Sequence, residues 1–359
     1  MDSFSKLLRR VSRSAVIVLP FLVSTHTAIA ADKLPALGVN LENTSVSGLS
    51  SGAFMTSQFY VVNSDIMVGA GVIAGGPYLC AQSYAYQSYM VNATTACMNP
   101  LTASVGPNTQ MLVSKTKKLS KEKKIDNIDN IKDDKIYIFS GKADHVVATK
   151  VVDQTEKFFL DLGVDADSIL YNTNVDAGHA IITNNKKDTE CDLTKAPFIN
   201  DCDFEQSHRI IRHIYGDTKP PSEKATGKII KFDQLEFVDS EYTSMSKHAY
   251  AYVPDQCYSQ SCNLHVVFHG CLQGADVIGD QYYAGTGYNE IADTNNLVML
   301  YPQVHPSKGK PLNPQGCWDF WGYSLPEESQ PDYFTKEAPQ IKAVTKMVKR
   351  LAQQNVAAQ

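Results

Sequence analysis

Several common sequence features are missing from this chain. It contains no CxxC pair, which argues against a cysteine-rich zinc site. Beyond residue 30 no segment is long and apolar enough for a membrane helix, so we expect the rest of the chain to be soluble. We find no internal repeat, no low-complexity tail and no Ser/Thr-rich stalk leading to an accessory domain. These absences favour a globular chain without a membrane anchor.

The chain is also short of positive charge. Its formal net charge is −5, and this becomes −8 when residues 1–30 are removed. An acidic protein is a poor partner for nucleic acids and anionic lipid surfaces, so we expect no nucleic-acid binding and no membrane insertion. A neutral or cationic substrate is compatible with this charge.

The first 30 residues are organised like a secretory signal. Lys6 and three arginines precede the apolar run AVIVLPFLV, and the small residues AIA end at Ala30. The run is too short to span a bilayer and is interrupted by Pro20. We expect cleavage near Ala30 and a secreted protein, either extracellular or periplasmic.

All eight cysteines lie in the part that would be exported. An even number in an oxidising compartment predicts up to four disulfides, for which 105 connectivities are possible in principle. Pairing neighbours in the sequence gives Cys80–Cys97, Cys191–Cys202, Cys257–Cys262 and Cys271–Cys317 as our working prediction.

Short apolar segments alternate with helical patterns along the chain, which favours an α/β fold with a mainly parallel sheet and helices on both faces. The strand candidates are TSVSGL, MVGAGVIAG, KIYIFSG, SILYNTNV, HAYAYVP, LHVVFHG and LVMLYPQ. The clearest helical patterns cover 52–63, 147–162, 203–215 and 335–353, and the charged stretch 115–135 reads as a solvated helix or loop. We expect a single domain over 31–359, with a linker within the fold at 216–228.

The residues Gly48-Leu49-Ser50-Ser51-Gly52 match the pattern G-x-S-x-G. They lie between a predicted strand and a predicted helix, which is where this pattern forms a sharp turn that presents a nucleophilic serine. Ser50 is the candidate nucleophile. Ser51 would begin the helix, where its backbone N–H can stabilise a negative oxygen.

A serine nucleophile needs a base and an acid to orient it. Asp144 follows the strand candidate KIYIFSG, and His179 lies in the glycine-containing loop after SILYNTNV. Asp176 is an alternative acid, but it lies only three residues before His179 and suits a local turn. His145 is an alternative base, but it adjoins Asp144 and is expected to face solvent. His208 and His213 lie on a helical pattern and are expected to be structural.

The strand candidate LHVVFHG runs into His269-Gly270-Cys271, a loop of the kind that supplies a second oxyanion donor. We expect the Cys271 N–H to be that donor and His265 and His269 to be strand-end residues. In the ordinary hydrolase order such a loop precedes the nucleophile, whereas here it follows His179. A circular permutation with a join near 216–228 explains this order.

Both tryptophans occur in the aromatic stretch NPQGCWDFWGYS at 313–324. Aromatic residues are often only part of a core, and one tryptophan is expected to be buried. Because Cys317 is predicted to pair with Cys271, we expect Trp318 to form a wall of the substrate cleft, with Trp321 and Tyr323 as further contacts.

Taken together, these motifs resemble the secreted poly(3-hydroxybutyrate) depolymerases of the single-domain, circularly permuted α/β-hydrolase type. The similar blocks are SVSGLSSGAFM, IDNIKDDKIYIFSGKADHVV, NVDAGHA, YVPDQC, HVVFHGCLQ, YPQ with GCWDFWGY, and YFTKEAPQI, which cover nearly all of the chain after residue 30.

The resemblance implies a triad of Ser50, Asp144 and His179 and an oxyanion hole from the amides of Ser51 and Cys271. It also implies a tryptophan-lined crevice for one polyester strand. We expect ester hydrolysis through an acyl-enzyme, without a metal or organic cofactor, and we expect a monomer. The same blocks occur in secreted feruloyl and acetyl xylan esterases, so a carbohydrate esterase is the alternative.

Overall fold

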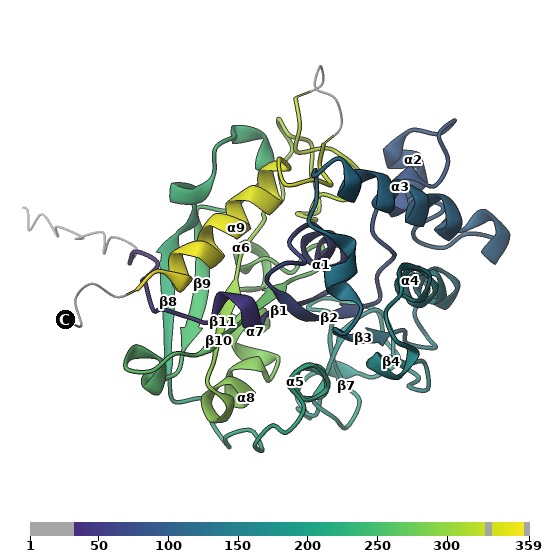
Figure 1. Ribbon diagram of the computed structural model, residues 1–359. Coiled ribbons are helices and arrows are strands. Elements are labelled where there is room, and N and C mark those ends of the chain that lie inside the picture. Colours follow the sequence, from purple (N-terminus) through teal and green to yellow (C-terminus); the bar gives the residue numbers. More distant parts are fainter. Residues whose placement is uncertain (1–31, 327–331, 355–359) are drawn as a thin grey trace, which may run out of the picture. The chain divides into compact units, whose positions relative to one another are not determined.

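Figure 1 shows the computed structural model, which describes residues 32–326 and 332–354. The chain divides into residues 1–30 and 31–359, and every described residue belongs to the second part. The expected secretion signal therefore lies outside the described residues. No helix in the described ranges has the length and apolar character needed to cross a membrane.

An eight-stranded sheet forms the centre of the described part, in the order β4-β3-β2-β1-β10-β11-β9-β8. Neighbouring strands run parallel from β4 to β11, and β9 is antiparallel to both β11 and β8. The strands are β1 (Thr44–Leu49), β2 (Met67–Ile73), β3 (Lys135–Phe139), β4 (Ile169–Asn172), β8 (Lys228–Asp233), β9 (His248–Val253), β10 (Asn263–Phe268) and β11 (Leu297–Tyr301). The prediction of a mainly parallel sheet is confirmed.

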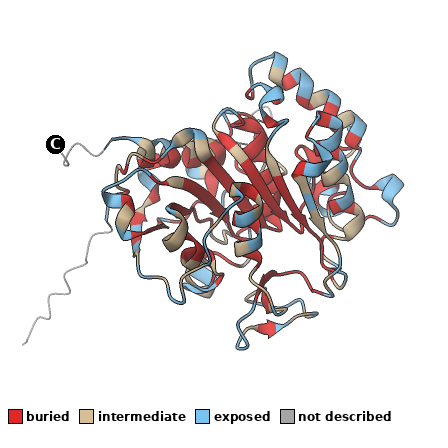
Figure 2. Ribbon diagram, turned by 60° about the horizontal axis from the view of Figure 1, so that its bottom comes forward, coloured by how far each residue is buried: buried red, intermediate tan, exposed pale blue. Residues whose placement is uncertain are grey.

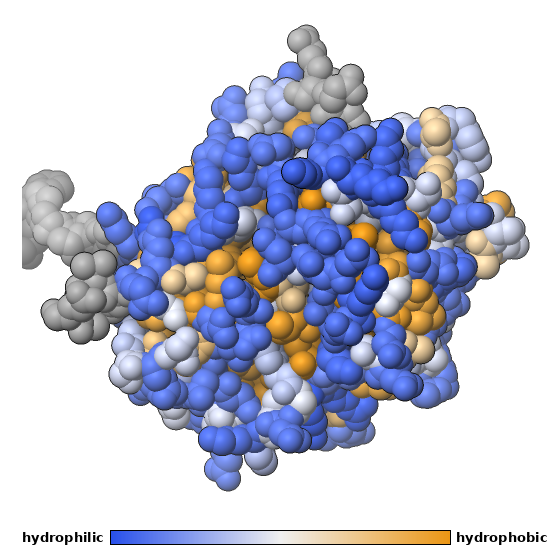
Figure 3. Space-filling view, viewed as in Figure 1, coloured by the Kyte–Doolittle hydropathy of each residue, from blue (hydrophilic) through white to orange (hydrophobic). Residues whose placement is uncertain are grey.

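Helices cover both faces of this sheet. The helices are α1 (Ser51–Val62), α2 (Tyr89–Thr94), α3 (Thr109–Lys121), α4 (Thr149–Leu162), α5 (Gln206–Tyr215), α6 (Ala275–Ile278), α7 (Gln281–Gly285), α8 (Tyr288–Asn295) and α9 (Pro339–Ala352). In Figure 1, α1, α4 and α9 lie on one side of the sheet and α5 and α8 on the other. Figure 3 shows mostly hydrophilic residues over α9, whose apolar residues Ile341, Val344, Met347, Val348 and Leu351 are buried beneath.

The central strands are buried on both faces because helices cover both of them. All six residues of β1 and all five of β11 are buried, and Figure 2 shows the middle of the sheet as a largely buried layer. Two glycines of β2 allow the close approach of α5. A Cβ atom added to Gly69 or Gly71 would lie 2.9 Å from a methyl carbon of Ile214 or Ile210.

The strand order agrees with a circular permutation. If the chain is renumbered to begin at β8, the sheet reads 1-2-4-3-5-6-7-8, with the antiparallel strand in second place. The strand β10 then becomes the third, from which an α/β hydrolase takes its oxyanion loop. The turn that carries Ser50 then follows the fifth.

Two sets of strands were not expected from the sequence. The strand β8 is an edge strand with both exposed and buried residues, and it begins at Lys228, the last residue of the expected linker at 216–228. A second sheet of three short strands, in the order β5-β7-β6, comprises β5 (Ile181–Thr183), β6 (Thr189–Glu190) and β7 (Ile199–Asp201). This small sheet follows the loop that carries His179 and thereby supports it.

Candidate active site

Ser50 lies at the turn between β1 and α1. Its backbone has φ 58° and ψ −123°, a conformation that residues with a Cβ atom rarely adopt. A Cβ atom on Gly48 would lie 2.5 Å from the Gly52 carbonyl oxygen, and one on Gly52 would lie 2.4 Å from that of His269. Both glycines are therefore needed sterically, and the turn presents the Ser50 side chain at the carboxyl end of the sheet.

Asp144 and His179 form a buried hydrogen-bonded pair. The distance from His179 Nδ1 to Asp144 Oδ2 is 2.7 Å, and the two residues are 6% and 5% exposed. Asp144 Oδ1 accepts hydrogen bonds from the N–H groups of Val146 at 2.8 Å and Val147 at 3.0 Å. Because a carboxylate only accepts, His179 carries its proton on Nδ1 and keeps Nε2 as a base.

Two glycines bring the loops of Asp144 and His179 together. A Cβ atom on Gly141 would lie 2.1 Å from the Ala177 carbonyl oxygen, and one on Gly178 would lie 2.2 Å from that of Leu193. The loops are joined by a hydrogen bond from the Ala143 N–H to the Ala177 carbonyl at 3.1 Å. The glycines in SGKAD and DAGH are therefore required by close backbone contact.

Ser50 and His179 line the same cavity of about 240 Å³. Among the described residues Ser50 Oγ makes no hydrogen bond to His179. A long separation is common in a free enzyme, because such contacts tighten when substrate binds. Two of the three expected triad residues, Ser50 and His179, thus line this cavity, and the third, Asp144, is hydrogen-bonded to His179.

The alternative acid and bases lie elsewhere. His145 and Asp176 are exposed. On α5, His208 Nε2 lies 2.9 Å from the Gly287 carbonyl oxygen and His213 Nε2 lies 3.0 Å from that of Ser168, and burial lowers the pKa of both histidines. These two histidines therefore hold α5 in place, as expected.

His265 and His269 are also structural. Burial lowers the pKa of His265 to about 3 and that of His269 to about 4, so both are neutral at pH 7. His265 lies between Ser45 Oγ at 2.6 Å and Ser47 Oγ at 2.7 Å. Within residues 32–326 and 332–354 there is no group of three or more His, Cys, Asp or Glu residues placed to hold a metal ion.

The loop after β10 approaches Ser50 from the other side of the turn. The Gly270 N–H donates to Gln273 Oε1 at 2.7 Å, and the Leu272 N–H donates to the Gln315 carbonyl at 2.7 Å. In the described part of the chain the Cys271 N–H donates to no acceptor. Ser51 is the first residue of α1, where N–H groups have no partner within the helix. Two such amides beside a nucleophile suit an oxyanion hole.

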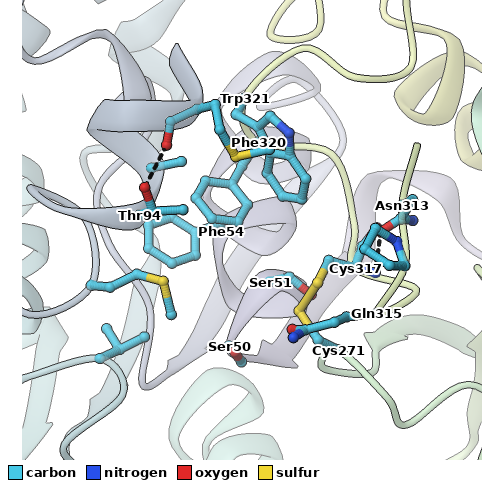
Figure 4. A pocket seen from close by; sticks show the side chains of 15 residues that line it. Ser50, Ser51, Phe54, Thr94, Cys271, Asn313, Gln315, Cys317, Phe320 and Trp321 are labelled. Carbon is cyan, nitrogen blue, oxygen red and sulfur yellow. Dashed lines mark hydrogen bonds between the residues drawn. A yellow bond between two sulfur atoms is a disulfide. The ribbon is translucent and has the colours of Figure 1, made fainter. Parts of the chain in front are cut away.

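The four predicted disulfides are all present, namely Cys80–Cys97, Cys191–Cys202, Cys257–Cys262 and Cys271–Cys317. The last of these joins the loop after β10 to the aromatic stretch 313–324. It therefore fixes the candidate oxyanion donor relative to the aromatic side chains (Figure 4).

A second cavity of about 250 Å³ adjoins the first at Ser50. Both are lined by Ser50, Met98, Cys271 and Gln315. The second is mainly apolar, and its other lining residues include Phe54, Met90, Ala93, Val147, Phe320 and Trp321. Figure 4 shows the aromatic side chains on one side of this cavity and the disulfide with Gln315 on another. Ser50 thus lies where the two cavities meet, and we treat them as two halves of one cleft.

The expectation that Trp318 forms a wall of the cleft is wrong. Its side chain is fully buried, and its ring centre lies 4.7 Å from that of Phe268 on β10. The backbone N–H of Trp318 donates to Ser51 Oγ at 3.2 Å, and the preceding Cys317 is held by its disulfide. These two constraints direct the indole ring into the core.

Trp321 does line the second cavity, whereas Tyr323 is not among its lining residues. The Tyr323 hydroxyl donates to the Cys317 carbonyl at 2.5 Å. Phe54, Phe320 and Met98 also line this cavity and were not predicted from the sequence. A signal for Phe54 was present, because it lies one helical turn after Ser50 on the helix that the motif begins.

No family model matches the chain. Over 351 residues it is 37% identical to the poly(3-hydroxybutyrate) depolymerase of Delftia acidovorans, a match that covers 96% of this chain and 66% of that protein. Over 309 residues it is 35% identical to the polyhydroxybutyrate depolymerase of Talaromyces funiculosus, covering 82% of this chain and 86% of that protein. The chain thus spans about two thirds of the length of the Delftia protein.

Two solved structures are similar to most of the chain. One is the PHB depolymerase from Penicillium funiculosum, and the other is a PHB depolymerase with one serine replaced by alanine, in complex with an R3HB trimer. Each has a TM-score of 0.78 and 31% identity, and each match covers 90% of this chain and 100% of the other. The chain therefore belongs to the poly(3-hydroxybutyrate) depolymerase family of serine carboxylic-ester hydrolases, with an α/β-hydrolase fold.

Proposed function

We propose that this protein is a secreted esterase that hydrolyses poly(3-hydroxybutyrate)-type polyesters to short 3-hydroxyacid oligomers or monomers through an acyl-enzyme. The observation that carries the proposal is that Ser50, at its strained turn, and His179, paired with Asp144, line one cavity. The named relatives support a polyester substrate. The mainly apolar second half of the cleft suits a neutral aliphatic chain.

In the proposed mechanism His179 Nε2 takes the proton of Ser50 Oγ as the oxygen attacks the ester carbonyl. The bond to the leaving alkoxide breaks, and His179 returns the proton to it. Water then attacks the acyl-enzyme, His179 takes the water proton and gives it back to Ser50, and the free acid leaves. The amides of Ser51 and Cys271 hold the oxyanion, and loss of one donor costs about 3 kcal/mol in the barrier. These steps need neither a metal nor an organic cofactor.

We further propose that residues 31–359 are the catalytic domain, with the permutation join near 216–228, and that the protein acts as a monomer. Four disulfides support an oxidising compartment and hence secretion after loss of residues 1–30. Trp321 is the substrate contact that we retain from the aromatic stretch, since it lines the cleft.

The test is release of soluble products from amorphous poly(3-hydroxybutyrate) by the wild type, Ser50→Ala and His179→Ala. We expect both variants to lose activity by roughly 10³-fold or more. His145→Ala and Ser57→Ala are the matched controls, because His145 is exposed and Ser57 Oγ bonds only the Gly76 carbonyl. Wild-type activity in Ser50→Ala would contradict the mechanism. Turnover of methyl ferulate or acetylated xylan without release from polyester would favour a carbohydrate esterase instead.

A further inference from the structure

The aromatic wall of the cleft lies on a segment without regular secondary structure. Phe320 and Trp321, which line the second cavity, belong to an irregular turn at 317–324. Such a turn needs other contacts to hold its side chains in one place. The disulfide of Cys317 fixes only its first residue.

The carboxylate of Asp319 lies at the centre of this turn. It is 1% exposed and accepts five hydrogen bonds, all from residues later in the same turn. Oδ1 accepts from the N–H groups of Trp321 at 3.0 Å, Gly322 at 2.6 Å and Tyr323 at 3.2 Å. Oδ2 accepts from the N–H of Ser324 at 2.9 Å and from its hydroxyl at 2.6 Å. The carboxylate thus gathers the backbone of the turn around itself.

These bonds leave no lone pair of Asp319 available for substrate. A carboxylate offers about four lone-pair sites, and five donors occupy them here. Burial raises the pKa of Asp319, while the hydrogen bonds from Ser324, Gly322 and Trp321 act in the opposite direction. Asp319 does not line either cavity. Its carboxylate is therefore placed to shape the turn and not to take part in a proton transfer.

The backbone of Asp319 is anchored to two helices of the fold. Its N–H donates to Gln340 Oε1 on α9 at 2.9 Å, and its carbonyl accepts from Gln58 Nε2 on α1 at 2.8 Å. Because α1 begins directly after Ser50, this second bond relates the turn to the nucleophile. The backbone of Asp319 is thus fixed by two helices, and its carboxylate in turn holds residues 321–324.

Contacts between aromatic rings also connect this turn to α1. Phe320 stacks on Phe54 of α1 with ring centres 4.1 Å apart and planes 8° apart, and Trp321 lies edge-on to Phe320 at 4.9 Å. The wall therefore runs from the nucleophile's helix to Trp321. Its outer member, Trp321, has its backbone held by Asp319.

We propose that Asp319 is a positioning residue for substrate binding, whose carboxylate holds Trp321 against the polyester chain. This rests on the proposed function. In Asp319→Asn an amide nitrogen replaces one acceptor oxygen and faces N–H donors, so the turn should loosen while Ser50, Asp144 and His179 keep their contacts.

The test is a double-mutant cycle on a soluble trimer of 3-hydroxybutyrate, with a short p-nitrophenyl ester as second substrate. We expect Asp319→Asn to raise the KM for the trimer roughly tenfold and to change kcat on the aryl ester less than about threefold. Trp321→Ala should raise the KM similarly, and adding Asp319→Asn to it should raise the KM no further. Independent, multiplicative effects would overturn the proposal, as would an unchanged KM in Asp319→Asn.

A fluorescence measurement separates positioning from general destabilisation. Trp318 is fully buried, so quenching by acrylamide reports mainly on Trp321, and we expect it to increase in Asp319→Asn. If Asp319→Asn does not fold, Ser324→Ala takes its place. It removes one donor of five, and we expect a roughly twofold rise in KM that disappears in the Trp321→Ala background.

Ser50→Ala is measured in the same series to separate the two hypotheses. If Ser50→Ala hydrolyses the trimer like the wild type, or the wild type does not hydrolyse it, the proposed function fails. If Ser50→Ala is inactive and Asp319→Asn has the KM of the wild type, only the role of Asp319 fails.

Discussion

The loops at 140–148 and 317–324 each contain one buried aspartate, and the two carboxylates are used differently. Asp144 accepts two backbone N–H groups on Oδ1 and keeps Oδ2 for His179, which comes from another loop. Asp319 receives all its donors from its own turn, on both oxygens. Burial alone therefore does not mark a carboxylate as part of the chemistry. An oxygen left for a side chain from elsewhere in the fold is the more informative sign.

The largest effect should come from a change at Asp144, whose Oδ2 is bonded to His179. We expect Asp144→Asn to lower kcat on a soluble ester by about 10⁴-fold, because the amide no longer holds the required tautomer of His179. The melting temperature should change by only a few degrees, because the loop keeps its backbone contacts. Steady-state kinetics and thermal melting check this. A kcat within tenfold of the wild type would remove the distinction between the two carboxylates.

The second prediction concerns the Cys271–Cys317 disulfide, which anchors the loop at 317–324. The loop at 140–148 contains no cysteine. The Cys271–Cys317 disulfide closes a sequence separation of 46 residues, and Cys257–Cys262 closes one of 5. Replacing the first pair by alanines should lower the free energy of unfolding by roughly 4 kcal/mol, and replacing the second by roughly 2 kcal/mol. Denaturant unfolding measures both. Equal losses would contradict the expected dependence on loop length.

A third carboxylate extends the comparison to a group with too few donors. Glu205 Oε1 accepts from the Asn184 N–H at 3.3 Å, while Oε2 is buried and has no partner among the described residues. Burial, followed by the nearby carboxylates of Glu290, Asp188 and Asp201, raises the pKa of Glu205 from 4.5 to about 7.

Between pH 4.5 and 7 the unfolded chain binds fewer protons at Glu205 than the folded chain, so the free energy of unfolding falls as the pH rises. Glu205→Gln should therefore be more stable than the wild type at pH 8, by about 1 kcal/mol after allowance for partial exposure, and similar to it at pH 5. Urea unfolding at the two pH values checks this, with the exposed Glu190→Gln as the control. A difference that is the same at both pH values would contradict the charge assignment.

The smallest effect should come from the hydrogen bond behind His179. Its N–H donates to Thr194 Oγ1 at 2.9 Å, and Thr194 is exposed. Because water can replace the lost hydroxyl, Thr194→Val should lower kcat by about threefold and the free energy of unfolding by about 1 kcal/mol or less. The exposed Thr102→Val serves as the control. A loss of more than 100-fold would show that water does not replace this hydrogen bond.

Local patterns in the sequence predicted most of the sheet. All seven strand candidates correspond to strands. Five of them, β1, β2, β3, β10 and β11, are short and mostly buried apolar runs, as expected of parallel strands covered on both faces. The strand β8 was missed since its exposed lysines, Lys228 and Lys231, give it the pattern of an edge strand or a loop. The strands β5, β6 and β7 have at most three residues each, too few for a recognisable period.

The candidate site was predictable where each residue carries its own local signal. Ser50 lies in a strand-turn-helix motif, and Asp144 and His179 lie in glycine-containing loops after strands. Trp318 and Trp321 lie three positions apart in an irregular segment, where no period shows which ring faces the core. Their placement depends on the contacts of Ser51 and Asp319, which lie outside any local pattern.

The place of β1 in the sheet has a consequence for the order in which the fold can assemble. The strand before Ser50 comes early in the chain, yet it pairs with β10, whose residues lie about 220 positions later. While the polypeptide is still being made, β1 to β4 can associate. The edge of β1 that later pairs with β10 stays unpaired until then. An oxyanion hole that uses the Cys271 amide, as we propose, can therefore form only after β10 has been made.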